Sequence, residues 1–132
     1  RLASDLKNGV VYIAPGGKHM RVVKKGTDYC IKLSDEPAID GLRPCANVMY
    51  ESLENCQYDE ITCVVLTGMG ADGTKGIQGL AAHHKKLHVI AQDADTCVVY
   101  GMPKAIAQTG LVDEVVPLGS VAETITKNVG VS

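Results

Sequence analysis

The run of residues 60–77 constrains the fold of this chain more than any other part of it. Its first half, "EITCVVLTG", contains an unbroken apolar segment, which is typical of a strand buried on both faces of a parallel sheet. Three glycines follow closely, Gly68, Gly70 and Gly73, and a segment with helical spacing of apolar residues comes next. A buried strand, a tight glycine turn and a helix make one unit of an α/β fold.

The remaining segments extend this alternation. Strands are predicted for residues 87–92 and 112–118, and helices for residues 72–86, 96–110 (in one or two pieces) and 120–130, the last with Ser120 and Glu123 as a capping box. In the first half, residues 9–15 predict a strand, residues 20–37 two extended, hairpin-like segments, residues 36–44 an irregular loop, and residues 45–56 a helix. Alternating strands and helices predict right-handed crossovers and a doubly wound parallel sheet.

Composition is that of one globular domain. The 132 residues are 45% apolar and include no Phe or Trp, so Val, Ile, Leu, Met and Ala must form the core. The net charge of −2 gives no general reason to expect nucleic acid, and no apolar run of about 18 residues predicts a membrane span. Five cysteines at scattered spacings, without a C-x-x-C pair, favour a reducing, cytoplasmic setting. Because the first residue is Arg1, we expect a piece of a longer protein.

The glycine turn allows more than one interpretation. Gly68, Gly70 and Gly73 spell G-x-G-x-x-G, and Asp93 closes the next strand, as in a dinucleotide-binding fingerprint. Asp72 argues against that interpretation, because its carboxylate would repel a pyrophosphate by about 4 kcal/mol at 4 Å near a protein surface. Two other roles for Asp72 stay open: the cap of a helix start, or the orienting acid of a nucleophile–histidine–acid triad.

The residues alone do not complete such a triad. No G-x-S-x-G turn occurs. Cys45 lies near a helix start, a place that lowers the pKa of a thiol, so a Cys45–His19–Asp72 arrangement is conceivable. "PGGKH" lacks the first glycine and the Ser or Thr of a P-loop. No metal site is predicted, since no Cys or acid cluster accompanies the histidines of the second half, namely His83, His84 and His88.

Four longer motifs point to a known family. "VYIAPGGKHM", "RPCANVMYESL", "VVLTGMGADGTKGI" and "VIAQDADTCVVYGMPKAIAQTGLVDEVVPL" follow one another in this order. Together they resemble the catalytic domain of the bacterial chemotaxis methylesterases, the CheB family, from about residue 9 to the last helix. The T-G-M-G-x-D-G loop and the A-Q-D…V-V-x-G-M-P block carry most of the resemblance.

The resemblance implies a fold and an activity. The fold would be a Rossmann-like, doubly wound parallel sheet in a three-layer sandwich, with a small β-hairpin insertion and with the first strands missing here. The activity would be hydrolysis of glutamate methyl esters on chemoreceptors, and possible deamidation of receptor glutamines, by a Ser-His-Asp triad without metal or organic cofactor. The family motif places the triad acid on Asp72. It assigns the loop that lines the catalytic cleft and the oxyanion to Gly68, Met69 and Gly70.

The resemblance also implies what this chain lacks. The serine and histidine motifs of the family lie upstream and have no counterpart here, and His19 matches a different histidine. Residues 1–132 are thus expected to form a partial methylesterase domain, without its first part and without the upstream receiver domain, and inactive by itself. Cys45, Ala46 and Asn47 replace the usual Ser-Val-Asp of the family. The chemoreceptor and the receiver domain are the expected partners, and an exposed sheet edge is expected to permit dimerisation.

Overall fold

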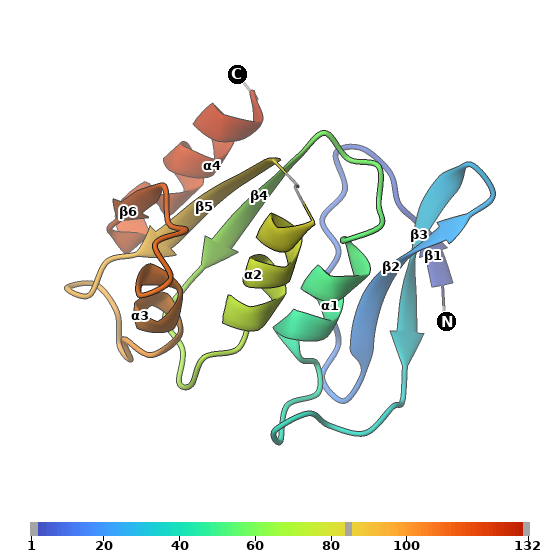
Figure 1. Ribbon diagram of the computed structural model, residues 1–132, viewed down its shortest axis with the longest axis horizontal. Helices are drawn as coiled ribbons and strands as arrows, with labels where there is room; N and C mark the ends of the chain where they lie inside the picture. The colour runs from blue at the N-terminus through green and yellow to red at the C-terminus, as the bar shows by residue number, and fades with distance from the viewer. Residues whose placement is uncertain (1–2, 84–85, 131–132) are drawn as a thin grey trace.

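Two three-stranded sheets form the framework of the chain. The computed structural model describes residues 3–83 and 86–130. The first sheet is antiparallel, in the order β1-β3-β2, and contains β1 (Ala3–Asp5), β2 (His19–Lys25) and β3 (Asp28–Ser34). The second sheet is parallel, in the order β4-β5-β6, and contains β4 (Glu60–Val65), β5 (Lys86–Gln92) and β6 (Glu114–Val116). Figure 1 shows the two sheets at opposite ends of the molecule.

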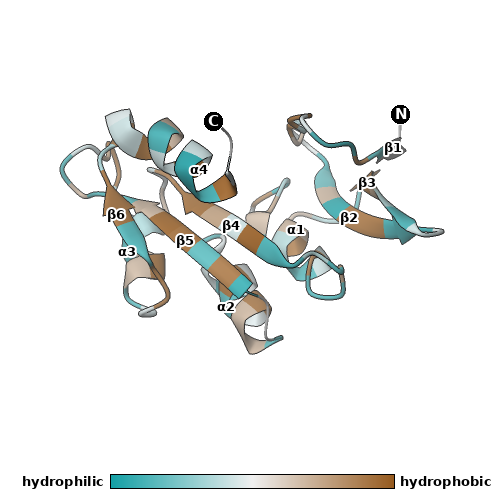
Figure 2. Cartoon of the chain, turned by 90° about the horizontal axis from the view of Figure 1, so that it is seen from above, coloured by the Kyte–Doolittle hydropathy of each residue, from teal (hydrophilic) through white to brown (hydrophobic). Residues whose placement is uncertain are grey.

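The helices complete a layered α/β arrangement. They are α1 (Ala46–Ser52), α2 (Thr74–Ala82), α3 (Met102–Ala107) and α4 (Val121–Val129), and a 3-10 turn, η1 (Leu118–Ser120), precedes the last. Figure 2 shows α2 and α3 on one face of the parallel sheet and α4 on the other. Both faces of the sheet are therefore covered, which confirms the predicted doubly wound class and the antiparallel hairpin beside it.

Helix α1 joins the two sheets. It packs against α2 on one side and against β2 on the other. Leu53, the residue after α1, packs against both hydrophobic cores. The larger core lies between the parallel sheet and its helices, and the smaller one lies under the antiparallel sheet; they include, respectively, Cys63, Val65, Ile77, Leu80, Val89 and Ile106, and Val22, Ile31 and Cys56.

The apolar runs predicted the parallel strands correctly, since β4 lies within residues 60–68 and β5 covers residues 87–92 and begins one residue earlier. The predicted strand at residues 9–15 is wrong. Val11 and Ile13 are 86% and 85% exposed, and the segment pairs with no strand among the described residues. Tyr12 fixes the segment instead: its hydroxyl donates to the Asp5 carbonyl at 2.8 Å and accepts the Lys7 N–H at 2.9 Å. An apolar segment does not form a strand when no partner strand exchanges backbone hydrogen bonds with it.

Several element ends also differ from the prediction. The predicted capping box is wrong, because Ser120 is the last residue of η1, has helical backbone angles and makes no side-chain capping hydrogen bond. Residues 96–110 contain only one short helix, α3. The strand predicted for residues 112–118 shortens to β6. Helix α2 ends at Ala82, and β5 begins at Lys86; the predicted helical residues 84–85 lie outside the described residues.

Candidate functional site

The candidate site lies where β4 ends and α2 begins, at the carboxyl edge of the parallel sheet. The connecting turn, residues 67–73, is called the glycine loop below. A cavity of about 560 Å³ lies between this loop and residues 39–47, and a smaller one of about 240 Å³ lies between α1 and the start of β2. Cys45 and Asp72 line both cavities. Ligand sites of open α/β sheets are expected at this edge.

The first half of the glycine loop is hydrogen-bonded to the turn before α3. Gly68 donates its N–H to the Val99 carbonyl at 3.1 Å, and its own carbonyl accepts the Met102 N–H at 2.8 Å. A Cβ on Gly101 would lie 2.7 Å from the Gly68 carbonyl oxygen and 3.0 Å from the Gly70 nitrogen. The two turns therefore approach so closely that only glycine fits between them. The T-G-M-G and Y-G-M-P motifs therefore meet in space at this contact.

The carboxylate of Asp72 holds the first turn of α1. Its Oδ2 accepts the Ala46 N–H at 2.7 Å, and its Oδ1 accepts the Asn47 N–H at 3.0 Å. Asp72 therefore does cap a helix, but the helix is α1, more than 20 residues earlier in the chain, rather than the α2 that follows it. Amides at a helix start interact favourably with a carboxylate, and the two hydrogen bonds fix the direction of the Asp72 side chain.

Asn47 makes the reverse contact. Its side-chain Oδ1 accepts the N–H groups of Gly73 at 2.9 Å and Gly76 at 2.8 Å, which are otherwise unpaired amides at the start of α2. Each helix start is thus capped by a side chain from the other segment. Gly76 permits the close approach, because a Cβ there would lie 2.6 Å from the Tyr50 Cβ. The sequence interpretation did not assign this role to Asn47, and its only signal was an Asn in the first turn of a predicted helix.

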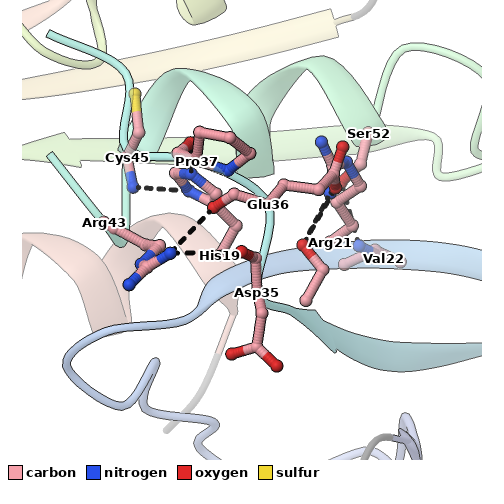
Figure 3. A network of polar contacts seen from close by, with 10 residues as sticks. His19, Arg21, Val22, Asp35, Glu36, Pro37, Arg43, Cys45 and Ser52 are labelled. Carbon is pink, nitrogen blue, oxygen red and sulfur yellow. Dashed lines mark hydrogen bonds and ion pairs between the residues drawn. The ribbon is translucent and has the colours of Figure 1, made fainter.

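Cys45 contacts both His19 and Asp72, but the three residues do not act as nucleophile, base and acid of a triad. His19 is buried; its Nδ1 accepts the Cys45 backbone N–H at 3.3 Å, so its Nε2 carries the proton and donates to the Pro37 carbonyl at 2.9 Å (Figure 3). Both ring nitrogens are therefore engaged by backbone groups. The Cys45 thiol donates to Asp72 Oδ1 at 3.3 Å, and burial, together with that carboxylate, raises the pKa of the thiol. The expectation of a lowered thiol pKa is wrong, and His19 is no base for Cys45.

The glycine loop does not offer a dinucleotide the full set of free backbone amides that its pyrophosphate would need. The Gly68 amide is bonded to Val99, and the Gly73 amide is bonded to Asn47. Gly70 has a left-handed backbone and lines the larger cavity, but Asp72, whose carboxylate would repel a phosphate, lines the same cavity. Asp93 binds its own turn, accepting from the Thr96 N–H at 3.0 Å. Two of the three glycine amides of the fingerprint are thus occupied, and so is the acid expected on a ribose.

The remaining predicted residues fall in two places. Met69 is 85% exposed and lines the larger cavity with Gly70. His83 and His88 lie at the opposite edge of the sheet, where His88 Nε2 contacts Glu114 Oε2 at 2.6 Å, and His84 lies outside the described residues. Across residues 3–83 and 86–130, no group of three His, Cys, Asp or Glu side chains could hold a metal ion.

The wall opposite the glycine loop was missed by the sequence analysis. Residues 39–42 form a tight turn in which Ile39 and Leu42 exchange backbone hydrogen bonds of 3.0 and 2.9 Å. Asp40 and Gly41 have positive φ angles of 51° and 80° at its tip. The Asp-Gly pair is the available signal for such a turn. Ile39 and Leu42 remain 45% and 41% exposed, so this wall presents apolar side chains to the larger cavity.

None of the helices in the described ranges is long and apolar enough to cross a membrane.

Comparison with known proteins places these motifs in one family. The family model described as CheB methylesterase matches residues 2–125. The chain is 43% identical over 126 residues to a protein-glutamate methylesterase/protein-glutamine glutaminase of Desulfotalea psychrophila, covering 94% of this chain and 34% of that protein. A protein of the same name from Oceanobacillus iheyensis is also 43% identical, over 123 residues, covering 92% of this chain and 35% of that protein. The chain thus spans about a third of the length of the relatives it matches.

One solved structure extends the comparison to three dimensions. The crystal structure of the Thermotoga maritima CheB methylesterase catalytic domain superposes with a TM-score of 0.86 at 32% identity. The match covers 96% of this chain and 66% of that one. The two sheets and the glycine loop described above therefore belong to a known catalytic-domain fold.

Proposed function

We propose, from the premise that this chain belongs to the CheB methylesterase family, that it supplies the acid and one wall of a protein-glutamate methylesterase site. The proposed substrates are glutamate methyl esters on chemoreceptors, and the names of the relatives support a second activity on receptor glutamines. The reaction is an acyl transfer without a metal. Its serine and histidine would come from a preceding segment of the same protein.

One observation carries the proposal: the carboxylate of Asp72 is held rigidly at the cavity edge and still has acceptor capacity. Each carboxylate oxygen accepts about two hydrogen bonds. Oδ1 accepts from Asn47 and Cys45, whereas Oδ2 accepts only the Ala46 N–H among the described residues. Oδ2 can therefore accept one more N–H, and an imidazole Nδ1–H is the group that a triad acid requires.

The proposed mechanism follows from this placement. The serine hydroxyl attacks the ester carbonyl while the histidine takes its proton and then delivers it to the departing methoxide, so methanol leaves. Water repeats the sequence on the acyl-enzyme and releases the glutamate carboxylate. Asp72 fixes the histidine tautomer and stabilises the imidazolium through Oδ2. Met69 and Gly70 line the larger cavity, in which the ester and its oxyanion would lie. Gly68 does not line it and supports the loop from behind, through its hydrogen bonds to Val99 and Met102.

The proposal extends to the setting of this segment. We propose that residues 1–132 are part of a larger catalytic domain, with a receiver domain upstream in the same protein, and that the protein acts in the cytoplasm. The supporting observation is that relatives of this family are about three times as long as the match. The open edge of β4 and the exposed Val11 and Ile13 would be surfaces for self-association of the isolated chain.

The test is the Asp72→Asn variant of the full-length protein. With methylated receptor as substrate, turnover measured as methanol release should fall by up to about 10⁴, because Asn favours the wrong histidine tautomer. The melting temperature should also fall by a few degrees, because Asn has one acceptor oxygen and its NH₂ group would face the N–H of either Ala46 or Asn47. Turnover is therefore compared at a temperature at which both proteins are folded. Wild-type turnover in this variant would refute the assignment of Asp72 as the triad acid, whereas a wild-type protein that releases no methanol would favour a non-catalytic interaction domain of the same fold.

A further inference from the structure

Asn47 contacts the proposed acid in two directions. Its backbone N–H donates to Asp72 Oδ1 at 3.0 Å, and its side-chain Oδ1 accepts the N–H of Gly73, the next residue after Asp72, at 2.9 Å. These two hydrogen bonds close a ring that runs through Asn47, the Asp72 carboxylate and the peptide bond between Asp72 and Gly73. The side chain of Asn47 thereby fixes the peptide that carries Asp72, and its main chain fixes the carboxylate itself.

The second acceptor bond of Asn47 anchors that ring to the helix. The same Oδ1 accepts the Gly76 N–H at 2.8 Å, so one oxygen bridges two amides in the first turn of α2. Gly76 leaves no room for adjustment, because a Cβ there would lie 3.1 Å from the Asn47 Cα and 2.6 Å from the Tyr50 Cβ. Side chains whose rotamers are locked by packing hold reacting groups within the narrow tolerance that catalysis needs.

We propose that Asn47 is a positioning residue for Asp72: it orients the carboxylate toward the histidine without touching the reacting atoms. The inference rests on the proposed function. The family resembled by the sequence usually has Asp at this place, and here the residue is a neutral amide. A carboxylate oxygen could accept the same two N–H groups, so the position requires an acceptor of this length rather than a particular charge.

The test compares Asn47→Ala and Asn47→Asp in the full-length protein with methylated receptor as substrate. Asn47→Ala removes both acceptor bonds and frees the glycine loop, so kcat should fall by about 10-fold while KM stays within about twofold, since small displacements of an orienting group cost rate rather than binding. Asn47→Asp restores the acceptor, so kcat should return to within about threefold of wild type. If Asn47→Ala does not fold, Asn47→Ser, which cannot span the distance to Gly76, is measured against the same expectations.

A matched control separates positioning from stability. Ile77→Val removes one methyl group from the core face of α2, where Ile77 is fully buried, and should lower the melting temperature by a few degrees without changing kcat. Asn47→Ala with unchanged kcat, or with a raised KM alone, beside an inactive Asp72→Asn variant would reject the role of Asn47 and leave the proposed function standing. Wild-type turnover in Asp72→Asn would reject both.

Discussion

Replacement of Gly101 by alanine tests whether the glycine loop is positioned by the turn before α3. The backbone of Gly101 has a φ of −102°, which any residue adopts, so the effect of a methyl group is purely steric. Its Cβ would lie 2.7 Å from the Gly68 carbonyl oxygen, 3.0 Å from the Gly70 nitrogen and 3.2 Å from the Gly70 oxygen. All three atoms are backbone, so no side chain can rotate away.

The magnitude follows from these distances. Ordinary carbon–oxygen contacts begin at about 3.3 Å, so the loop must move by about 0.6 Å. Overpacking of this kind costs about 2 kcal/mol. For 132 residues, with about 2.1 cal/mol/K of unfolding entropy per residue, this corresponds to a fall of about 7 °C in melting temperature. The displaced loop also carries Met69 and Asp72, so kcat should fall together with stability.

The assay is thermal unfolding of the 132-residue chain by circular dichroism, paired with methanol release by the full-length protein from methylated receptor. Gly119→Ala is the matched control, because a Cβ at Gly119 meets nothing within 4 Å and its backbone needs no left-handed angle. The control should melt within about 2 °C of wild type. A Gly101→Ala variant that melts with the control and keeps full turnover would show that the two turns are not the rigid contact described above.

Two further predictions concern activity and pH. A protein consisting of residues 1–132 alone should release no methanol from methylated receptor above background, because the serine and histidine motifs are not among its residues; measurable turnover would place the nucleophile within this chain. Hydrogen bonds from His88 and Asn128 hold the pKa of Glu114 below its ordinary value of 4.5. The stabilisation by Glu114 is therefore complete above about pH 4.5 and is lost as the pH falls through its lower folded value, so Glu114→Gln should flatten the acid limb of melting temperature against pH. Asp95→Asn, at an exposed site, is the control, and parallel curves for all three proteins would contradict this account.

The fold was predictable where burial alone decides the structure. The apolar run of β4 is buried by helices on both faces, so its sequence carries the signal by itself. Residues 9–15 have a comparable apolar content, but a strand exists only if another strand accepts its backbone bonds. Ser120 and Glu123 match a capping box, yet η1 places Ser120 in a helical conformation, and this depends on the chain before it.

The site was predictable only in part. The glycine spacing and the family motif led to Asp72, and the structure places it at the cavity. The partners of its carboxylate lie 25 and 26 residues earlier in the chain, on a helix that the sequence does not connect to the glycine loop. Local patterns favoured a cap on the helix that follows Asp72. Reciprocal capping by Asn47 is a tertiary contact, so no spacing rule within one element could reveal it.

The position of α1 between the two sheets connects distant surfaces to the acid. The Val22 N–H of β2 donates to the Ser52 hydroxyl at 2.9 Å, at the last residue of α1, and the first amides of the same helix hold the Asp72 carboxylate. One helix of seven residues therefore contacts the antiparallel sheet at its last residue and the Asp72 carboxylate at its first amides, so the hairpin and the glycine loop share a single structural support.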